Sequence, residues 1–205
     1  MSPARRWWTG QWLVAVVIGV MALIAGLSGG FGWEALRYER AAILEGELWR
    51  LVSGHWLHLG WSHLGLNLAG LLLVWLLWGK ALKSLEWTVG VLWIAVVQSL
   101  LLLALHPDIQ WYVGLSGLLH GLFAVGALRQ IAGEPLVAGV SLMALAGKLL
   151  LEFGGSTGGA VSSGAFPVVG EAHLYGVVSG VVYVVLLRSF EVFKSANAGA
   201  TVDRD

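Results

Sequence analysis

The chain has 205 residues, of which 58% are hydrophobic and only 12% charged, and its formal net charge is zero. Soluble domains carry about 25% charged residues, so this chain lacks the charge needed to cover a water-exposed surface. Zero net charge gives no indication of a nucleic-acid partner. The sequence contains no cysteine, which excludes disulfides, thiolate metal sites and cysteine nucleophiles. The composition predicts an integral membrane protein embedded in a lipid bilayer.

Apolar windows along the chain predict an all-α fold, a polytopic bundle of six transmembrane helices. A spanning helix needs about 20 mostly apolar residues. We expect the bundle to occupy residues 1–194, with spans near residues 11–28, 56–79, 87–106, 114–130, 135–151 and 168–189. Arg5 and Arg6 precede the first window as in a secretory signal, but no small-residue cleavage site follows, so we expect an uncleaved span. Residues 195–205 are expected to form a disordered tail.

The basic residues indicate how the bundle is oriented, because cytoplasmic segments collect lysine and arginine. With the N-terminus inside, the inner segments contain eight such residues: Arg5, Arg6, Lys80, Lys83, Arg129, Arg188, Lys194 and Arg204. The outer segments contain four: Arg37, Arg40, Arg50 and Lys148. Both termini are therefore predicted to be cytoplasmic, and the second, fourth and sixth spans run from outside to inside.

Polar side chains inside the spans are functional candidates, because leaving them unpaired in hydrocarbon is costly. They fall in three spans: His58, His63 and Asn67 in the second, Ser116 and His120 in the fourth, and His173 in the sixth. In the predicted orientation, His63, Ser116 and His173 all lie near the outer ends of their spans. Scattered core residues would not be expected to agree in depth, so this agreement favours a site in the outer leaflet.

Glycine spacing predicts how two of these spans pack. Glycines four residues apart let helix backbones approach closely, and such pairs occur in the fourth and sixth spans: Gly117 with Gly121, and Gly176 with Gly180. If these faces meet, Ser116 and His173 come within hydrogen-bonding reach. A serine hydroxyl attacks poorly until a base takes its proton, so this pair could form an activated nucleophile.

Donors for a developing oxyanion are available nearby. His63 and Asn67 are four residues apart and share a helix face. Together with the backbone N–H of Ser116 they could form an oxyanion hole. Each residue also has an ordinary explanation: a lone serine often bonds back to its own helix, and an asparagine often joins neighbouring helices.

His120 is an alternative base. It lies four residues after Ser116 on the same face, and helical side chains lean towards the N-terminus. It is either the base itself or a ring that packs against the base. No carboxylate is placed in the sequence to orient either imidazole, because Glu171 is two residues from His173 and points elsewhere. We therefore expect a Ser-His dyad rather than a triad.

A metal site is not expected, and neither is a cofactor. His55 and His58 are three residues apart, but no H-E-x-x-H motif occurs and the second window contains no acidic residue, which argues against a zinc hydrolase. We interpret His55 as an interfacial side chain.

Four motifs occur in order along the chain: W-R at Trp49–Arg50, H-x4-H-x3-N at His58, His63 and Asn67, G-x-S-G at Gly114–Gly117, and A-H-x2-G-x3-G at Ala172–Gly180. With these motifs the chain resembles the rhomboid intramembrane serine proteases over essentially all six spans. The resemblance implies that Ser116 is the nucleophile and His173 the general base, with His63, Asn67 and the Ser116 N–H in the oxyanion hole. The supporting residues would be Gly114, Gly117, His120, Gly176, Gly180, His58, Trp49 and Arg50.

The resemblance also implies that the first outer loop lies partly in the membrane and that the fifth loop and helix admit substrate laterally. The glycine- and serine-rich segment Phe153–Phe166 fits a mobile cap, although a passive linker is equally compatible with its composition.

Within that family the chain looks most like a rhombosortase. The features are its small size, the segments WYVGLSGLLHGLF and EAHLYG, and His120 in place of an aromatic residue. This similarity implies a protease of the bacterial inner membrane with its site facing the periplasm. Its substrates would be exported proteins with a C-terminal tail made of a Gly-Gly motif, a hydrophobic helix and a basic end. The alternatives are a non-catalytic relative that binds and escorts transmembrane helices, and a small transporter.

Overall fold

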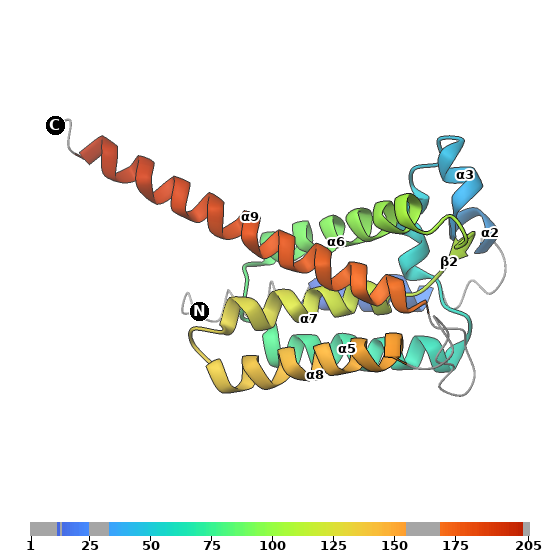
Figure 1. The fold of residues 1–205 in the computed structure, drawn as a ribbon, viewed down its shortest axis with the longest axis horizontal. Helices are drawn as coiled ribbons and strands as arrows, with labels where there is room; N and C mark the ends of the chain where they lie inside the picture. Colours follow the sequence, from blue (N-terminus) through green and yellow to red (C-terminus); the bar gives the residue numbers. More distant parts are fainter. Residues whose placement is uncertain (1–11, 13, 25–32, 155–168, 203–205) are drawn as a thin grey trace.

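The fold is a bundle of helices, described by a computed structural model for residues 12, 14–24, 33–154 and 169–202 (Figure 1). Within these ranges, four helices are long and apolar enough to cross a bilayer: α5 (Trp61–Trp78), α6 (Ser84–Leu105), α8 (Pro135–Gly154) and α9 (Gly170–Val202). Two shorter helices complete the bundle: the apolar helix Val14–Ile24, and α7 (Ser116–Gln130). The expected all-α membrane architecture is confirmed.

The segment that precedes α5 is folded into short elements: α2 (Trp33–Leu36), β1 (Tyr38–Glu39), α3 (Arg40–Leu44), α4 (Arg50–Ser53) and the 3-10 turn η1 (Gly54–Trp56). Strand β1 pairs antiparallel with β2 (Trp111–Tyr112), so that Tyr38 lies opposite Tyr112. Because β2 leads directly into α7, this ribbon ties the first connection to the start of α7 at one end of the bundle (Figure 1).

Arg50 holds this connection together from inside. Its side chain is buried and donates to the carbonyls of Glu34 at 2.6 Å and Arg37 at 2.9 Å, and it pairs with Glu47 at 2.6 Å. The neighbouring Trp49 donates its indole N–H to the carbonyl of Ala35 at 3.2 Å. The W-R pair therefore contacts the protein's own loop, and its role in the structure is architectural.

Helix α7 lies at the centre of the bundle and contacts α5, α6, α8 and α9. Its approach to α9 is very close: a Cβ built on Gly176 would lie 1.9 Å from the carbonyl oxygen of Gly117. A Cβ on Gly180 would lie 2.5 Å from the carbonyl oxygen of Gly121. Only glycine permits such contact, so the predicted packing of these two glycine faces is confirmed.

Two boundaries differ from those expected. Helix α5 begins at Trp61 rather than near residue 56, because residues 54–56 form the 3-10 turn and Gly60 is extended (φ 161°). His58 therefore precedes the second span instead of lying in it. Helix α9 continues to Val202, so residues 195–202 are helical where we expected a disordered tail; alanine is a strong helix former. The expected basic pair at residues 5–6 and most of the 153–166 loop lie outside the described residues.

Candidate active site

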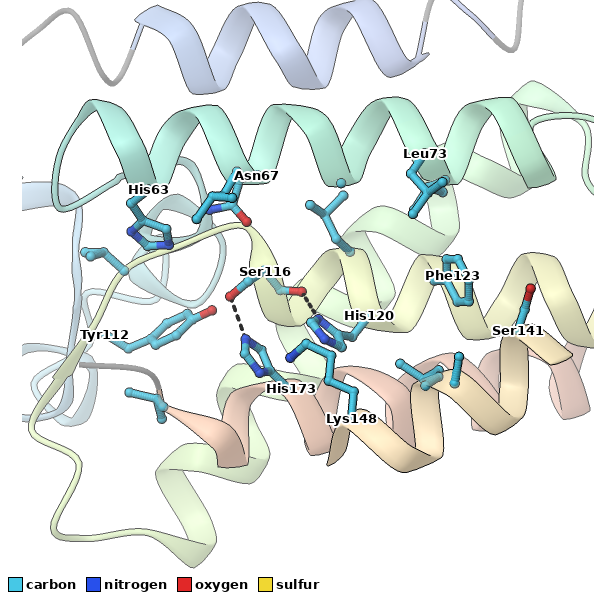
Figure 2. Close-up of a pocket in the computed structure, with 18 residues that line it drawn as sticks. His63, Asn67, Leu73, Tyr112, Ser116, His120, Phe123, Ser141, Lys148 and His173 are labelled. Carbon is cyan, nitrogen blue, oxygen red and sulfur yellow. Dashed lines mark hydrogen bonds between the residues drawn. The ribbon is translucent and has the colours of Figure 1, made fainter. Parts of the chain in front are cut away.

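Ser116 and His173 meet at one end of the bundle. Ser116 is the first residue of α7, and His173 lies in the first turn of α9. The N-terminal ends of α5, α7 and α9 all lie at this end, so the depth agreement inferred from the sequence corresponds to a real cluster (Figure 1). The His173 Nε2 atom lies 2.9 Å from the Ser116 Oγ atom, a hydrogen bond that Figure 2 shows crossing between the two helices.

His120 lies beside this pair and is stacked on His173. The two rings are 4.1 Å apart between centroids and inclined by only 14°. Its Nδ1 lies 2.6 Å from the backbone carbonyl oxygen of Ser116, and because a carbonyl only accepts, His120 carries its proton on Nδ1 (Figure 2). The sequence left two roles open for His120: the base itself, or a ring that packs against the base. In the structure His120 packs against the ring of His173, and its Nδ1 is bonded to the backbone.

His63 and Asn67 face the same space from α5 (Figure 2). The backbone N–H of Leu59 donates to His63 Nδ1 at 3.3 Å, so the proton of a neutral His63 ring is on Nε2. Asn67 is buried, and its Nδ2 has no hydrogen-bond partner among the described residues. Because Ser116 begins a helix, its own backbone N–H also lacks an intrahelical acceptor. Several donors thus surround the serine.

Two glycines make room for this arrangement. Gly114 has φ +132°, which side chains rarely adopt, and a Cβ there would lie 2.9 Å from the His63 ring. A Cβ on Gly117 would lie 2.6 Å from the carbonyl oxygen of Ala172, the residue before His173. A larger residue at position 114 would push away the imidazole of His63, and one at position 117 would push away helix α9.

A pocket of about 480 Å³ opens beside Ser116. It is walled by α5, α7 and α8 and changes character along its length (Figure 2). The polar residues His63, Ser116 and His173 lie at one end, while Leu73, Phe123 and the small polar residue Ser141 lie at the other (Figure 2). This shape could accept an apolar segment and hold its end against the serine.

The expectation that no carboxylate would reach the histidines is wrong. Glu152, near the C-terminal end of α8, places its two carboxylate oxygens 3.0 and 3.1 Å from His173 Nδ1. Lys148, one helical turn earlier, forms an ion pair with Glu152. The sequence held a signal for this contact: Glu152 ends a span that runs in the opposite direction to α7, and therefore reaches the same level as Ser116.

A second serine–histidine pair exists but is sealed in the core. We expected His55 to be an interfacial side chain, but it is buried. Its Nε2 lies 3.1 Å from both the Ala95 carbonyl oxygen and Ser99 Oγ. Since Ser99 donates its own proton to the Leu51 carbonyl (2.8 Å), His55 acts as a donor to it. Burial lowers the pKa of His55 to about 4, so the ring is neutral.

His58 is likewise neutral, because burial lowers its pKa to about 4. It precedes α5, and its ring lies 5.1 Å from that of His63 in an edge-to-face arrangement. Within the part of the chain that the structure describes, no three His, Asp or Glu side chains are grouped as metal ligands.

The Rhomboid domain family model matches residues 45–190 of the chain. The matched region includes Trp49, both members of the Ser116–His173 pair, and every other candidate site residue. No curated protein sequence matches the chain.

Proposed function

Because the chain belongs to the rhomboid family and is a multi-pass membrane protein, we propose that it is an intramembrane serine endopeptidase with Ser116 as nucleophile and His173 as general base. The single observation that supports this most strongly is the 2.9 Å contact between Ser116 Oγ and His173 Nε2 at one end of a pocket whose lining is mostly apolar.

The reaction begins when a segment of substrate lies in the pocket with a peptide carbonyl against Ser116. His173 Nε2 accepts the hydroxyl proton as Oγ attacks the carbonyl carbon, and the same proton then passes to the leaving amine. Negative charge on the carbonyl oxygen is met by Asn67 Nδ2, His63 Nε2–H and the backbone N–H at Ser116. Such donors are effective because they are oriented before the reaction begins. Water then hydrolyses the acyl-enzyme, or another nucleophile takes the acyl group.

The substrate class that we propose is a protein with a C-terminal Gly-Gly motif, a hydrophobic helix and a basic end, as in the rhombosortase subgroup. The apolar length of the pocket supports a hydrophobic segment, and glycines next to it would unwind readily to present a carbonyl. In this proposal the enzyme lies in the bacterial inner membrane, has both termini in the cytoplasm and acts on the periplasmic side.

The test is to co-express the protein with a reporter that carries such a tail and to determine the mass of the released product. The expected result is cleavage near the Gly-Gly motif, with any added group visible as extra mass. Ser116→Ala is expected to abolish cleavage, whereas the matched variant Ser99→Ala, at the buried serine that also contacts a histidine, retains it. Stable capture of the tail without cleavage by the wild-type protein would instead support a helix-binding escort.

A further inference from the structure

Glu152 places a carboxylate directly beside His173, the proposed base. Resting on the proposed protease function, we infer that Glu152 is a positioning residue that completes a Ser116–His173–Glu152 triad. Helix α8 contributes it, so the three members come from α7, α9 and α8.

The hydrogen bonds determine which nitrogen of His173 can act as the base. Ionised Glu152 can only accept, so the two contacts at 3.0 and 3.1 Å require the proton of His173 to be on Nδ1. Nε2 is then unprotonated and faces Ser116 Oγ at 2.9 Å. Without a partner on Nδ1 the neutral ring could equally carry its proton on Nε2, where it could not accept one from the serine.

The charge of Glu152 matters in the next step. When Ser116 transfers its proton to Nε2, His173 becomes an imidazolium, and the carboxylate next to Nδ1 stabilises that positive charge. The Nδ1 proton stays on Nδ1 throughout, and Glu152 remains ionised. The contact is well sheltered, because the side chains of His173 and Glu152 are only 7% and 14% exposed.

The surroundings hold both partners of the contact in place. Lys148 pairs with Glu152 from the preceding turn of α8 and so restricts the movement of its carboxylate. The stacked ring of His120 restricts the plane of His173 from the other side. The positive charge of Lys148 opposes an imidazolium, so the pairing reduces the stabilisation by Glu152 without removing it.

The test compares Glu152→Gln and Glu152→Ala with the wild-type protein, in reconstituted vesicles with a cleavable tail substrate. Glutamine keeps the shape and an acceptor oxygen but removes the charge; alanine removes both. We expect kcat to fall roughly 10- to 100-fold in Glu152→Gln, the range for losing one charge-assisted hydrogen bond, with a larger fall in Glu152→Ala. KM is expected to stay unchanged, because the contact acts on the base and not on the bound segment. The rate of labelling of Ser116 by a phosphonate should fall in parallel.

Glu171→Gln is the matched control, since it removes the same charge from α9 two residues before His173. We expect its kcat to be that of the wild-type protein. The inference is overturned if Glu152→Gln keeps the wild-type kcat, if its loss appears in KM, or if Glu171→Gln loses as much. Failure of the wild-type protein to cleave any tail or to be labelled would count against the proposed protease function itself, which separates the two results. Equal melting temperatures of the variants show that each is folded.

Discussion

Glycines 117 and 121 of α7 pack against glycines 176 and 180 of α9, and we call this contact the glycine seam. Replacing Gly176 by alanine tests whether the seam sets the distance between Ser116 Oγ and His173 Nε2. The added Cβ would lie 1.9 Å from the carbonyl oxygen of Gly117, whereas ordinary contact begins at 3.4 Å, so the helices must separate locally by about 1.5 Å. This seam is adjacent to the Ser116–His173 hydrogen bond, which is 2.9 Å long. A movement of that size breaks the bond.

The expected cost has two parts. Overpacking destabilises a folded protein by about 1–3 kcal/mol, measurable as a lower melting temperature in detergent. Misplacement of reacting groups by about 1 Å can reduce the rate 100-fold, so labelling of Ser116 by a phosphonate should slow by about that factor. The matched control is Gly139→Ala on α8, where no atom lies within 4 Å of the new Cβ and alanine favours the helix. Labelling of Gly176→Ala at the wild-type rate would refute the reasoning.

Four further predictions concern the site and its support. Asn67→Ala should lower kcat about 100-fold with KM unchanged in the vesicle assay, because it removes one oxyanion donor; an unchanged kcat would exclude that role. His120→Phe should retain the stacking on His173 and be up to about tenfold more active than His120→Ala, since an aromatic pair contributes about 0.5–1.5 kcal/mol; equal activities would contradict this. Arg50→Ala should lower the unfolding free energy by about 2–4 kcal/mol, because buried carbonyls lose their donor; a wild-type melting temperature would show otherwise. His55 has a folded pKa of about 4 against 6.5 when unfolded, so its contribution to stability is present above pH 6.5 and falls by up to about 3 kcal/mol towards pH 4; His55→Gln should flatten that pH dependence of unfolding, and an unaltered slope would rule it out.

The helical architecture and the meeting of α7 with α9 could be read from the sequence for physical reasons. Long apolar windows have few alternatives to a helix in lipid. The glycine pairs in the two spans restrict the packing further, because Gly176 permits an approach that no other residue does. Once those faces meet, the positions of Ser116 and His173 in the first turns of their helices bring them together.

The direction of the fifth span places Glu152 at the level of Ser116, but the residues around His173 in the sequence do not identify it, because the contact depends on how α8 lies against α9. The acidic residue nearest to His173 in the sequence is Glu171, and its spacing of two residues gives no information about α8. A carboxylate 21 residues before His173 becomes its neighbour only because the end of α8 lies level with the start of α9.

The environments of His55 and His58 were also beyond the reach of sequence pattern. The sequence predicts one continuous helix over residues 56–79, which includes His58 and starts directly after His55, but the chain makes a 3-10 turn and an extended glycine before α5 begins. Because of this break, the His55 side chain lies in the core, where it forms a hydrogen bond with Ser99 of α6. Hydropathy does not distinguish such a turn from the first turn of a helix.

In the proposed mechanism, His173 activates Ser116 by accepting its proton. The most direct test of this step is to treat the reconstituted protein with a serine-directed phosphonate and to map the adduct by peptide mass spectrometry. We predict a single adduct on Ser116 that forms far more slowly in His173→Ala protein of unchanged melting temperature. An adduct on another serine such as Ser99, or an undiminished rate in His173→Ala, would contradict the account.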